Sequence, residues 1–120
     1  MSHSKLATIH TFASLPTDFP MPLISRRRIM GDNMMMSHVV LEPGFTLAPH
    51  SHENEQFVVM LNGFAKFTLG QPGNTREVEL RTGQVIVLPP HEPHGCVAIE
   101  RCEVLDLFSP PSATTGVDRK

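Results

Sequence analysis

The sequence lacks both tryptophan and tyrosine, and its 120 residues include two cysteines. Without tyrosine, a phenol cannot act as the general acid, and any sugar-binding platform has to use phenylalanine. The two cysteines, Cys96 and Cys102, are too few for a disulfide framework. The longest apolar run, residues 57–61, is far shorter than the roughly 20 residues that a membrane-spanning helix needs. These absences predict neither a disulfide-stapled domain nor a membrane span.

The sequence also has no large excess of charge of either sign, because it contains 10 Lys and Arg residues and 12 Asp and Glu residues. Phosphate binding normally needs a basic excess, so nucleic acid is not the expected partner. Residues 1–7 lack the continuous apolar stretch of a secretory signal. Since 40% of the residues are hydrophobic, the chain can bury a core. We therefore expect a soluble, single-domain, cytoplasmic protein.

Prolines and glycines interrupt the whole chain, with 11 of the first and 8 of the second. The segments between them are apolar and about five to eight residues long, as strands are. Asn62-Gly63 stands between two apolar runs and indicates a hairpin, because both residues tolerate a positive φ. Many short strands in a small chain predict an all-β antiparallel sandwich or barrel. The predicted strands cover residues 6–12, 25–30, 34–41, 46–50, 56–61, 64–69, 76–80, 85–88, 95–99 and 103–108.

The chain is expected to divide into a folded domain and a tail. Residues 1–109 form the domain, including the N-terminal strand, and residues 110–120 carry no hydrophobic period and are expected to be a mobile tail. Both faces of the predicted strand 56–61 are apolar, with Val58 on one face and Phe57 on the other. A small barrel with two apolar sheet faces needs a cover, which predicts a homodimer.

Three of the seven histidines are placed to converge. His50 and His52 are two residues apart, so both side chains point to one face of an extended segment, and Gln56 shares that face. His94 opens a later strand. Neutral imidazole is a frequent ligand of divalent transition metals, and an amide oxygen can complete the set. The alternative is a group of surface histidines on a loop.

Two spaced motifs resemble those of the cupin superfamily. Gly44-x5-His50-x-His52-x3-Gln56-x6-Gly63 resembles the first cupin motif, which usually has Glu where Gln56 stands. Gly83-x5-Pro89-x-His91-x2-His94 resembles the second, which usually has Gly at the position of His91. The two motifs span residues 44–98. The resemblance implies a single-domain cupin double-stranded β-helix, a jelly-roll-like barrel, with one divalent metal bound inside by His50, His52, Gln56 and His94.

The amide at position 56 has a chemical consequence. Three imidazoles and an amide are neutral, so the cation keeps its full charge as a Lewis acid. This favours polarisation of a substrate oxygen over an oxygenase of the His-and-carboxylate type. A bulge in the strand could instead bring Glu53 or Glu55 to the metal. Nickel, zinc, manganese, iron and copper all accept this ligand set.

Asp106 interrupts the apolar stretch Val104-Leu105-Asp106-Leu107-Phe108. A carboxylate in such a strand is costly to bury unless it is paired or faces a polar cavity. A raised pKa there would suit general acid–base catalysis. The alternatives are a solvated strand edge or a capped turn. Asp106 is our candidate catalytic residue.

Further candidates could line the ligand pocket. Arg26 and Arg28 share one face of a predicted strand, and Arg27 takes the other. A guanidinium facing inward could bind a substrate carboxylate through two hydrogen bonds, or the arginines could be a basic sheet edge that prevents aggregation. His38 could line the pocket on the face of Met34 and Met36, or be a half-exposed strand residue.

Three segments resemble the small cupins of pectin degradation, which open 4,5-unsaturated uronate monosaccharides. They are Arg-Arg-Ile-x-Gly with Asp-Asn-Met-Met at 27–35, His-Ser-His-Glu at 50–53 with Gln56, and Val-Leu-Asp-Leu-Phe-Ser-Pro-Pro at 104–111. The resemblance implies that Asp106 is the acid–base residue and that Phe108 packs against the sugar. One departure concerns the substrate: where that family has Arg after the Pro pair, this chain has Ser112-Ala113-Thr114.

The first hypothesis is therefore a metal-dependent, non-oxidative enzyme of isomerase or lyase type, acting on a small oxygen-rich substrate such as an unsaturated uronate. Two alternatives remain open. One is an iron-dependent dioxygenase, and the other is a non-catalytic cupin that binds a small ligand.

Overall fold

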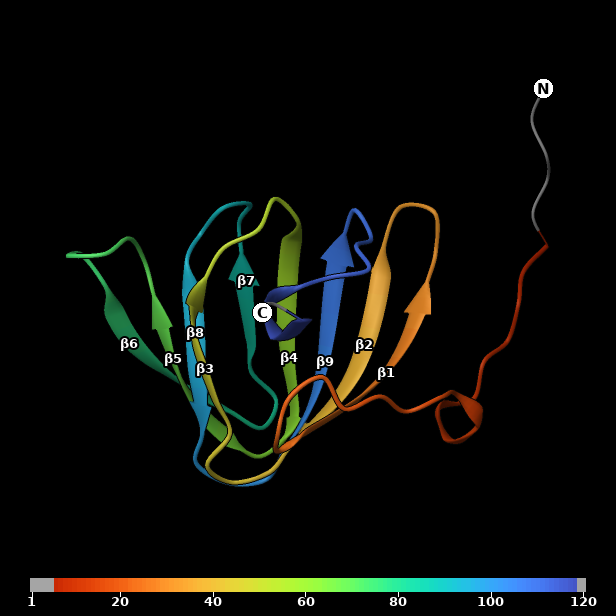
Figure 1. Ribbon diagram of the computed structural model, residues 1–120, viewed down its shortest axis with the longest axis horizontal. Helices are drawn as coiled ribbons and strands as arrows, with labels where there is room; N and C mark the ends of the chain where they lie inside the picture. The colour runs from red at the N-terminus through yellow and green to blue at the C-terminus, as the bar shows by residue number, and fades with distance from the viewer. Residues whose placement is uncertain (1–5, 119–120) are drawn as a thin grey trace.

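The computed structural model describes residues 6–118, which form two antiparallel sheets facing each other (Figure 1). The first sheet has five strands in the order β1-β2-β9-β4-β7, and the second has four in the order β3-β8-β5-β6. Residues 1–5 and 119–120, the outer ends of the predicted domain and tail, lie outside the described residues. The strands are β1 Ile24–Met30, β2 Met35–Leu41, β3 Thr46–His50, β4 Glu55–Asn62, β5 Phe64–Leu69, β6 Arg76–Arg81, β7 Val85–Leu88, β8 His94–Ala98 and β9 Cys102–Ser109.

The core lies between the two sheets and follows the alternation of the strands. In β2, for example, Met35, Ser37, Val39 and Leu41 are buried, and the residues between them are less so. β4 shows the same alternation, with Gln56, Val58 and Met60 inside. This confirms the expected all-β cupin barrel, with nine of the ten predicted strands present within a residue or two of their predicted ends.

The hairpin predicted at Asn62-Gly63 joins β4 to β5. Gly63 has a φ of +127°, and a Cβ at this position would lie 2.5 Å from the carbonyl oxygen of Arg101. A side chain is therefore excluded both by the backbone conformation and by the main chain of the adjacent segment.

The predicted strand over residues 6–12 is wrong. Residues 6–11 have no regular secondary structure and run away from the barrel, followed by the 3-10 turn η1, Phe12–Ser14 (Figure 1). The side chains of Leu6 and Ile9 are 87% and 96% exposed. Alternating apolar residues alone do not make a strand, because its backbone groups need a partner strand within reach.

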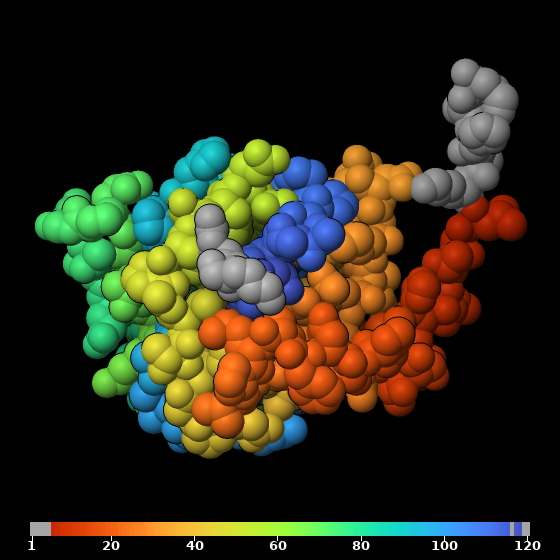
Figure 2. All heavy atoms as spheres, in the orientation of Figure 1, coloured from red at the N-terminus to blue at the C-terminus, as the bar shows by residue number. Residues whose placement is uncertain are grey.

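The C-terminal segment, which the sequence predicts as a tail, lies against the barrel. Residues 110–118 turn back across the open end of the barrel and end in the 3-10 turn η2, Gly116–Asp118 (Figures 1 and 2). Val117 packs against the core, and η2 lies next to β3. In the described part of the chain, neither helical turn is long enough to cross a membrane.

Candidate metal centre

Three histidines meet at one end of the barrel. His50 ends β3, His52 lies in the loop after it, and His94 begins β8. Their imidazole rings are close, with centroid distances of 4.3 Å from His50 to His94 and 5.0 Å from His52 to His94. One nitrogen of each ring lies within 4.8 Å of the others. The convergence predicted from the sequence is therefore present.

The pairing of β3 with β8 brings His50 and His94 together, since their Cα atoms are directly opposite. A bulge after Leu47 shifts the register so that the two histidines match. Gly95 allows the close approach, because a Cβ there would lie 2.6 Å from the carbonyl oxygen of Leu47. The His91 amide donates to the His52 carbonyl oxygen at 2.8 Å and holds the two loops together.

The hydrogen bonds of the three rings identify the nitrogen that would bind a metal. In each ring Nδ1 lies near a main-chain carbonyl oxygen: His50 to Ala48 at 3.2 Å, His52 to Asn54 at 3.0 Å and His94 to Glu92 at 2.8 Å. Because a carbonyl oxygen only accepts, Nδ1 carries the proton and Nε2 carries the lone pair. Burial lowers the pKa of His94 to about 4, so this ring is neutral at neutral pH.

Gln56 completes the set from β4. Its Oε1 lies 3.1 Å from Nε2 of His52, and its Nε2 donates to Oδ1 of Asp106 at 3.0 Å. The first contact joins two atoms that carry lone pairs, an arrangement that a cation between them would stabilise. The donor set therefore fits a divalent metal. Glu53 and Glu55 are exposed on the other face, so the expected alternative of a carboxylate ligand is not formed.

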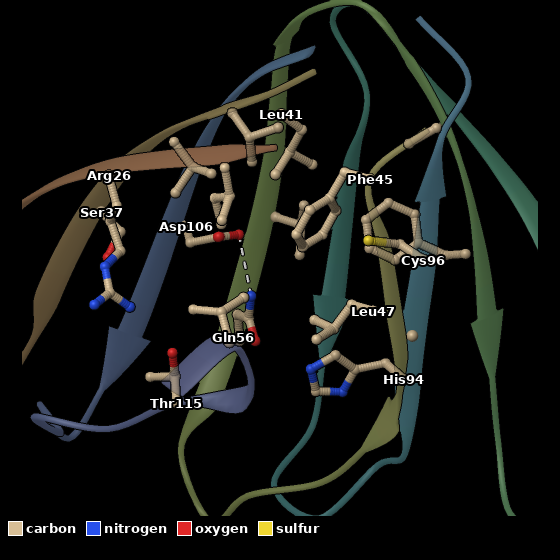
Figure 3. A pocket seen from close by; sticks show the side chains of 18 of the residues that line it. Arg26, Ser37, Leu41, Phe45, Leu47, Gln56, His94, Cys96, Asp106 and Thr115 are labelled. Atoms are coloured by element: carbon tan, nitrogen blue, oxygen red, sulfur yellow. Dashed lines mark hydrogen bonds between the residues drawn. The ribbon is translucent and has the colours of Figure 1, made fainter. Parts of the chain in front are cut away.

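Asp106 lines the same pocket from β9, beside Gln56 (Figure 3). Burial raises the pKa of Asp106 to about 7, against the opposing effects of the Gln56 hydrogen bond and the Arg26 charge. Phe108, two residues further along β9, lines the pocket as well, and its ring centroid lies 5.8 Å from that of His52. Among the candidates that the sequence offered, Asp106 brings an acid–base group and Phe108 an apolar surface to the side of the histidines.

The pocket lies between the two sheets and is polar at one end. Figure 3 shows Arg26 and Ser37 on one wall, His94 and Cys96 on the other, and Gln56 and Asp106 between them. The rest of the lining is apolar, including Val39, Leu41, Phe45, Val58 and Met60. Such a pocket excludes water from most of its surface and leaves a few polar groups to orient a ligand.

The sequence left open which arginine of the run faces inward; in the structure Arg26 is 3% exposed and lines the pocket. Its guanidinium is held by two carboxylates, Asp18 and Asp118, at 2.7 and 2.8 Å. Arg28 contacts Asp18 at 3.4 Å and donates to the Ala113 carbonyl oxygen at 3.0 Å. Arg27 faces the other way and donates to Thr17.

These ion pairs shift the titration of all three partners. The Arg26 hydrogen bond lowers the pKa of Asp18 below its ordinary value. Burial alone would raise the pKa of Asp118, but hydrogen bonds from Arg26 and the Thr115 amide lower it. Burial would lower the pKa of Arg26, and the two aspartates raise it instead. The guanidinium and both carboxylates are therefore charged at neutral pH.

His38 does not line the barrel pocket. It lies on the opposite face of β2 from Ser37, with Nε2 2.6 Å from an oxygen of Glu103 and its ring 4.7 Å from that of Phe12. The expectation of a pocket role is corrected for a physical reason. Both faces of β2 are apolar, so alternation separates the two faces without showing which one points inward.

Sequence reasoning missed three residues that shape the site. Asp118 pairs with Arg26, Thr115 lines the pocket, and Asn54 donates to the Pro110 carbonyl oxygen. Each contact depends on the C-terminal segment turning back over the barrel, and nothing in the composition of that segment signals the turn. Only Asn54 could have been found from the sequence, because it shares one face of an extended segment with His52 and Gln56.

A barrel of two antiparallel sheets with three imidazoles converging at one end defines a cupin-type barrel with a metal site. Comparison with known families agrees. The family model Cupin_2, described as a cupin domain, matches residues 37–108. The chain belongs to this family.

Solved structures add detail. KdgF from Halomonas sp. is 28% identical, with a TM-score of 0.80 over 90% of this chain and 97% of that one. An RmlC-like cupin from Shewanella frigidimarina is 18% identical, with a TM-score of 0.79 over 90% of this chain and 95% of that one. Bacillus subtilis oxalate decarboxylase, which contains Mn(II) centres, is 20% identical, with a TM-score of 0.79 over 93% of this chain and 32% of that one. The last two likenesses show the fold alone.

Among curated proteins, 3-hydroxyanthranilate 3,4-dioxygenase of Burkholderia cenocepacia is 30% identical over 89 residues. The match covers 67% of this chain, which spans half the length of that relative.

Proposed function

We propose that this cupin is a divalent-metal-dependent, non-oxidative enzyme that opens the ring of a small unsaturated uronate by proton transfer. The observation that carries the proposal is the chain of contacts from His52 through Gln56 to Asp106. It joins the metal ligands to a carboxyl group whose pKa, raised by burial to about 7, suits both accepting and donating a proton.

The ligands of the metal are His50, His52, Gln56 and His94. A divalent cation held by these neutral groups supplies a Lewis acid that polarises a hydroxyl or carbonyl oxygen of the substrate. Which of nickel, zinc, manganese, iron or copper occupies the site is open to elemental analysis. The Gln56 amide has a second task, because its N–H group orients the carboxylate of Asp106 toward the ligand.

Ring opening of a 4,5-unsaturated uronate is an isomerisation and needs no oxidant. The carboxylate of Asp106 takes the proton of the anomeric hydroxyl, whose oxygen becomes an aldehyde. The bond from the anomeric carbon to the ring oxygen breaks, and its electron pair leaves with the ring oxygen as an enolate. Asp106 returns the proton to the alkene carbon, which gives the ketone. Phe108 offers the sugar an apolar surface.

The likeness to KdgF supports this substrate class, since that chain is matched over nearly its whole length. The test is to load the protein with each candidate metal and add 4,5-unsaturated galacturonate. We expect loss of the ultraviolet absorbance of the conjugated alkene, with a keto product detected by NMR. Absence of turnover with all five metals would contradict the proposal.

A dioxygenase is the second candidate, favoured by the 30% identity to 3-hydroxyanthranilate 3,4-dioxygenase. Oxygen consumption by the Fe(II)-loaded protein with that relative's substrate would support it. A ligand-binding protein without catalysis is the outcome if neither reaction is seen and galacturonate still binds.

We also propose that two copies associate through the outer face of the five-stranded sheet in the cytoplasm. Phe57, Val85 and Val87 are exposed there and form an apolar surface on β4 and β7. A mass measurement in solution is expected to give twice the 13.3 kDa of one chain. A mass of one chain would contradict the dimer.

A further inference from the structure

The guanidinium of Arg26 holds two carboxylates at once, each through two nitrogen atoms, and one nitrogen, Nη2, is shared by both. Nε and Nη2 donate to Asp18 at 3.1 and 2.7 Å. Nη1 and Nη2 donate to Asp118 at 2.9 and 2.8 Å. Both are the two-point geometry in which a guanidinium binds a carboxylate, whether that carboxylate belongs to the protein or to a ligand.

The two aspartates occupy different positions. Asp18 belongs to the segment before β1 and is tied to Arg26 by two main-chain hydrogen bonds of 2.9 Å, so its place is set by the backbone. Its side chain is 45% exposed. Asp118 is 17% exposed and comes from the segment whose Thr115 and Val117 line the barrel pocket. Asp118 therefore takes the pocket side of the guanidinium.

The C-terminal segment is held to the barrel by a small number of side-chain contacts. Besides the Arg26–Asp118 pair, Arg28 donates to the Ala113 carbonyl oxygen, Asn54 donates to the Pro110 carbonyl oxygen, and Val117 packs against the core. The backbone hydrogen bond from Asp118 to Thr115 is internal to the segment. Contacts of this kind can be released without breaking a sheet.

We propose that Arg26 is the carboxylate anchor of the pocket and that Asp118 is an internal carboxylate that occupies it until a carboxylate-bearing ligand displaces it. The ligand's carboxylate replaces that of Asp118 on Nη1 and Nη2, so the buried guanidinium keeps a partner throughout the exchange. The C-terminal segment is then released from the mouth of the pocket. The inference rests on the proposed function for the position of the ligand beside Asp106.

The charges around Arg26 support the exchange. The cluster contains two arginines, Arg26 and Arg28, and two aspartates, Asp18 and Asp118. It is therefore neutral in the closed form, in which Asp118 is paired with Arg26. A neutral ligand that displaced Asp118 would leave a buried cation with one partner fewer, which is unfavourable. A carboxylate ligand restores the balance. This exchange of carboxylates on Arg26 therefore favours small anionic ligands over uncharged sugars of the same size.

Competition within the chain lowers the apparent affinity for a carboxylate, because binding must first open the closed form. Galacturonate tests this, since it carries the carboxylate but lacks the alkene, so opening of its ring yields no enolate and no keto product. Galactose is its uncharged counterpart. We expect Asp118→Ala and the isosteric Asp118→Asn each to bind galacturonate about tenfold more tightly than the unmodified chain, measured by calorimetry on metal-loaded protein, with galactose binding unchanged.

Asp18→Asn is the matched control, because it removes the same charge from the same guanidinium but leaves the pocket side occupied. Its galacturonate affinity is expected to stay within about threefold of the unmodified chain. In the unmodified chain, the Thr115 amide donates to Asp118 at 3.0 Å. Galacturonate should therefore accelerate hydrogen exchange at Thr115.

The proposal is overturned if the two Asp118 variants bind galacturonate no more tightly than the unmodified chain. It is also overturned if Asp18→Asn gains as much, if galactose gains as much, or if no variant binds galacturonate. Tighter galacturonate binding without turnover of the unsaturated uronate would leave this inference standing and remove the proposed reaction. Turnover of the unsaturated uronate with no effect of the Asp118 variants on galacturonate affinity would support the proposed reaction and contradict the role of Asp118.

Discussion

The amide nitrogen of Gln56 lies 3.0 Å from Oδ1 of Asp106, across the neighbouring strands β4 and β9. The contact joins strands that are also paired at Val58 and Asp106, so the geometry is set by the sheet. One end of the amide faces the histidines, and the other faces the carboxylate. A change at Asp106 is therefore expected to impair proton transfer and to leave the metal ligands in place.

Replacing Asp106 with Asn tests its acid–base role. The amide keeps an oxygen that can accept from Gln56 but cannot exchange a proton at neutral pH. We expect turnover of 4,5-unsaturated galacturonate to fall at least about 100-fold, with metal content by elemental analysis unchanged. His38→Gln, on the outer face of β2, is the control and should keep full turnover. Retained turnover in Asp106→Asn would remove Asp106 from the reaction.

Replacing His94 with Ala tests the metal site. The loss of a buried imidazole is expected to weaken metal binding at least about 100-fold, measured by competition with a chelator. His91→Asn removes an imidazole from the exposed loop nearby, and Asn tolerates the φ of +69° found there. That control should retain its metal. Equal loss in the two variants would argue against a site built on His94.

Gly95→Ala tests whether the close approach of β3 and β8 positions the metal ligands. The added Cβ would meet main-chain atoms of Leu47 and Pro49 at 2.6 and 2.8 Å, so the strands must separate. We expect a loss of about 1–3 kcal/mol in the free energy of unfolding and weaker metal binding, because His50 and His94 face each other across these strands.

Gly73→Ala separates this effect from a general loss of stability. It has a φ of +83° and open space around it, so a substitution there introduces backbone strain without forcing strands apart. It should cost about 1 kcal/mol and leave metal affinity unchanged. Unaltered metal affinity in Gly95→Ala would show that strand spacing does not govern the site.

The pair of Arg26 and Asp118 predicts a pH dependence of stability. Asp118 has a pKa below its ordinary value of 3.8 in the folded chain. The stability that the ionised Asp118 contributes is therefore fully present above pH 3.8. It is lost as the pH falls through the lowered pKa of the folded chain. We expect Asp118→Asn to cost about 1–2 kcal/mol at pH 7 and almost nothing at strongly acidic pH, by urea unfolding at one protein concentration.

The exposed pair of Glu79 and Arg81 supplies the control. Glu79→Gln should change the free energy of unfolding by less than about 1 kcal/mol across the pH range. If the cost of Asp118→Asn did not shrink in acid, the stabilisation would come from packing of the segment and not from its charge.

Much of the barrel could be predicted from local patterns. The Asn62-Gly63 turn and the bounds of β2 and β4 depend on neighbouring residues and on strand geometry, and they were placed correctly. The convergence of His50, His52 and His94 followed from parity together with the two cupin motifs.

Other features could not be predicted because they depend on contacts between distant residues. The two faces of β2 are too similar in composition to show that His38 points outward. Residues 6–12 have the composition of a strand but no partner strand within the described chain. The pairing of Asp118 with Arg26 joins residues 92 positions apart, and a short polar segment gives no signal of its target.

Arg26 also fastens the two ends of the folded chain, since Asp18 precedes the first strand and Asp118 follows the last. This arrangement affects where a purification tag can be placed. A purification tag joined beyond Asp118 would be tethered at the mouth of the pocket, and a polyhistidine tag would bring spare imidazoles within reach of the metal. Because residues 6–11 run away from the barrel (Figure 1), preparations that carry the tag at the N-terminal end are the better material for assays of metal and ligand.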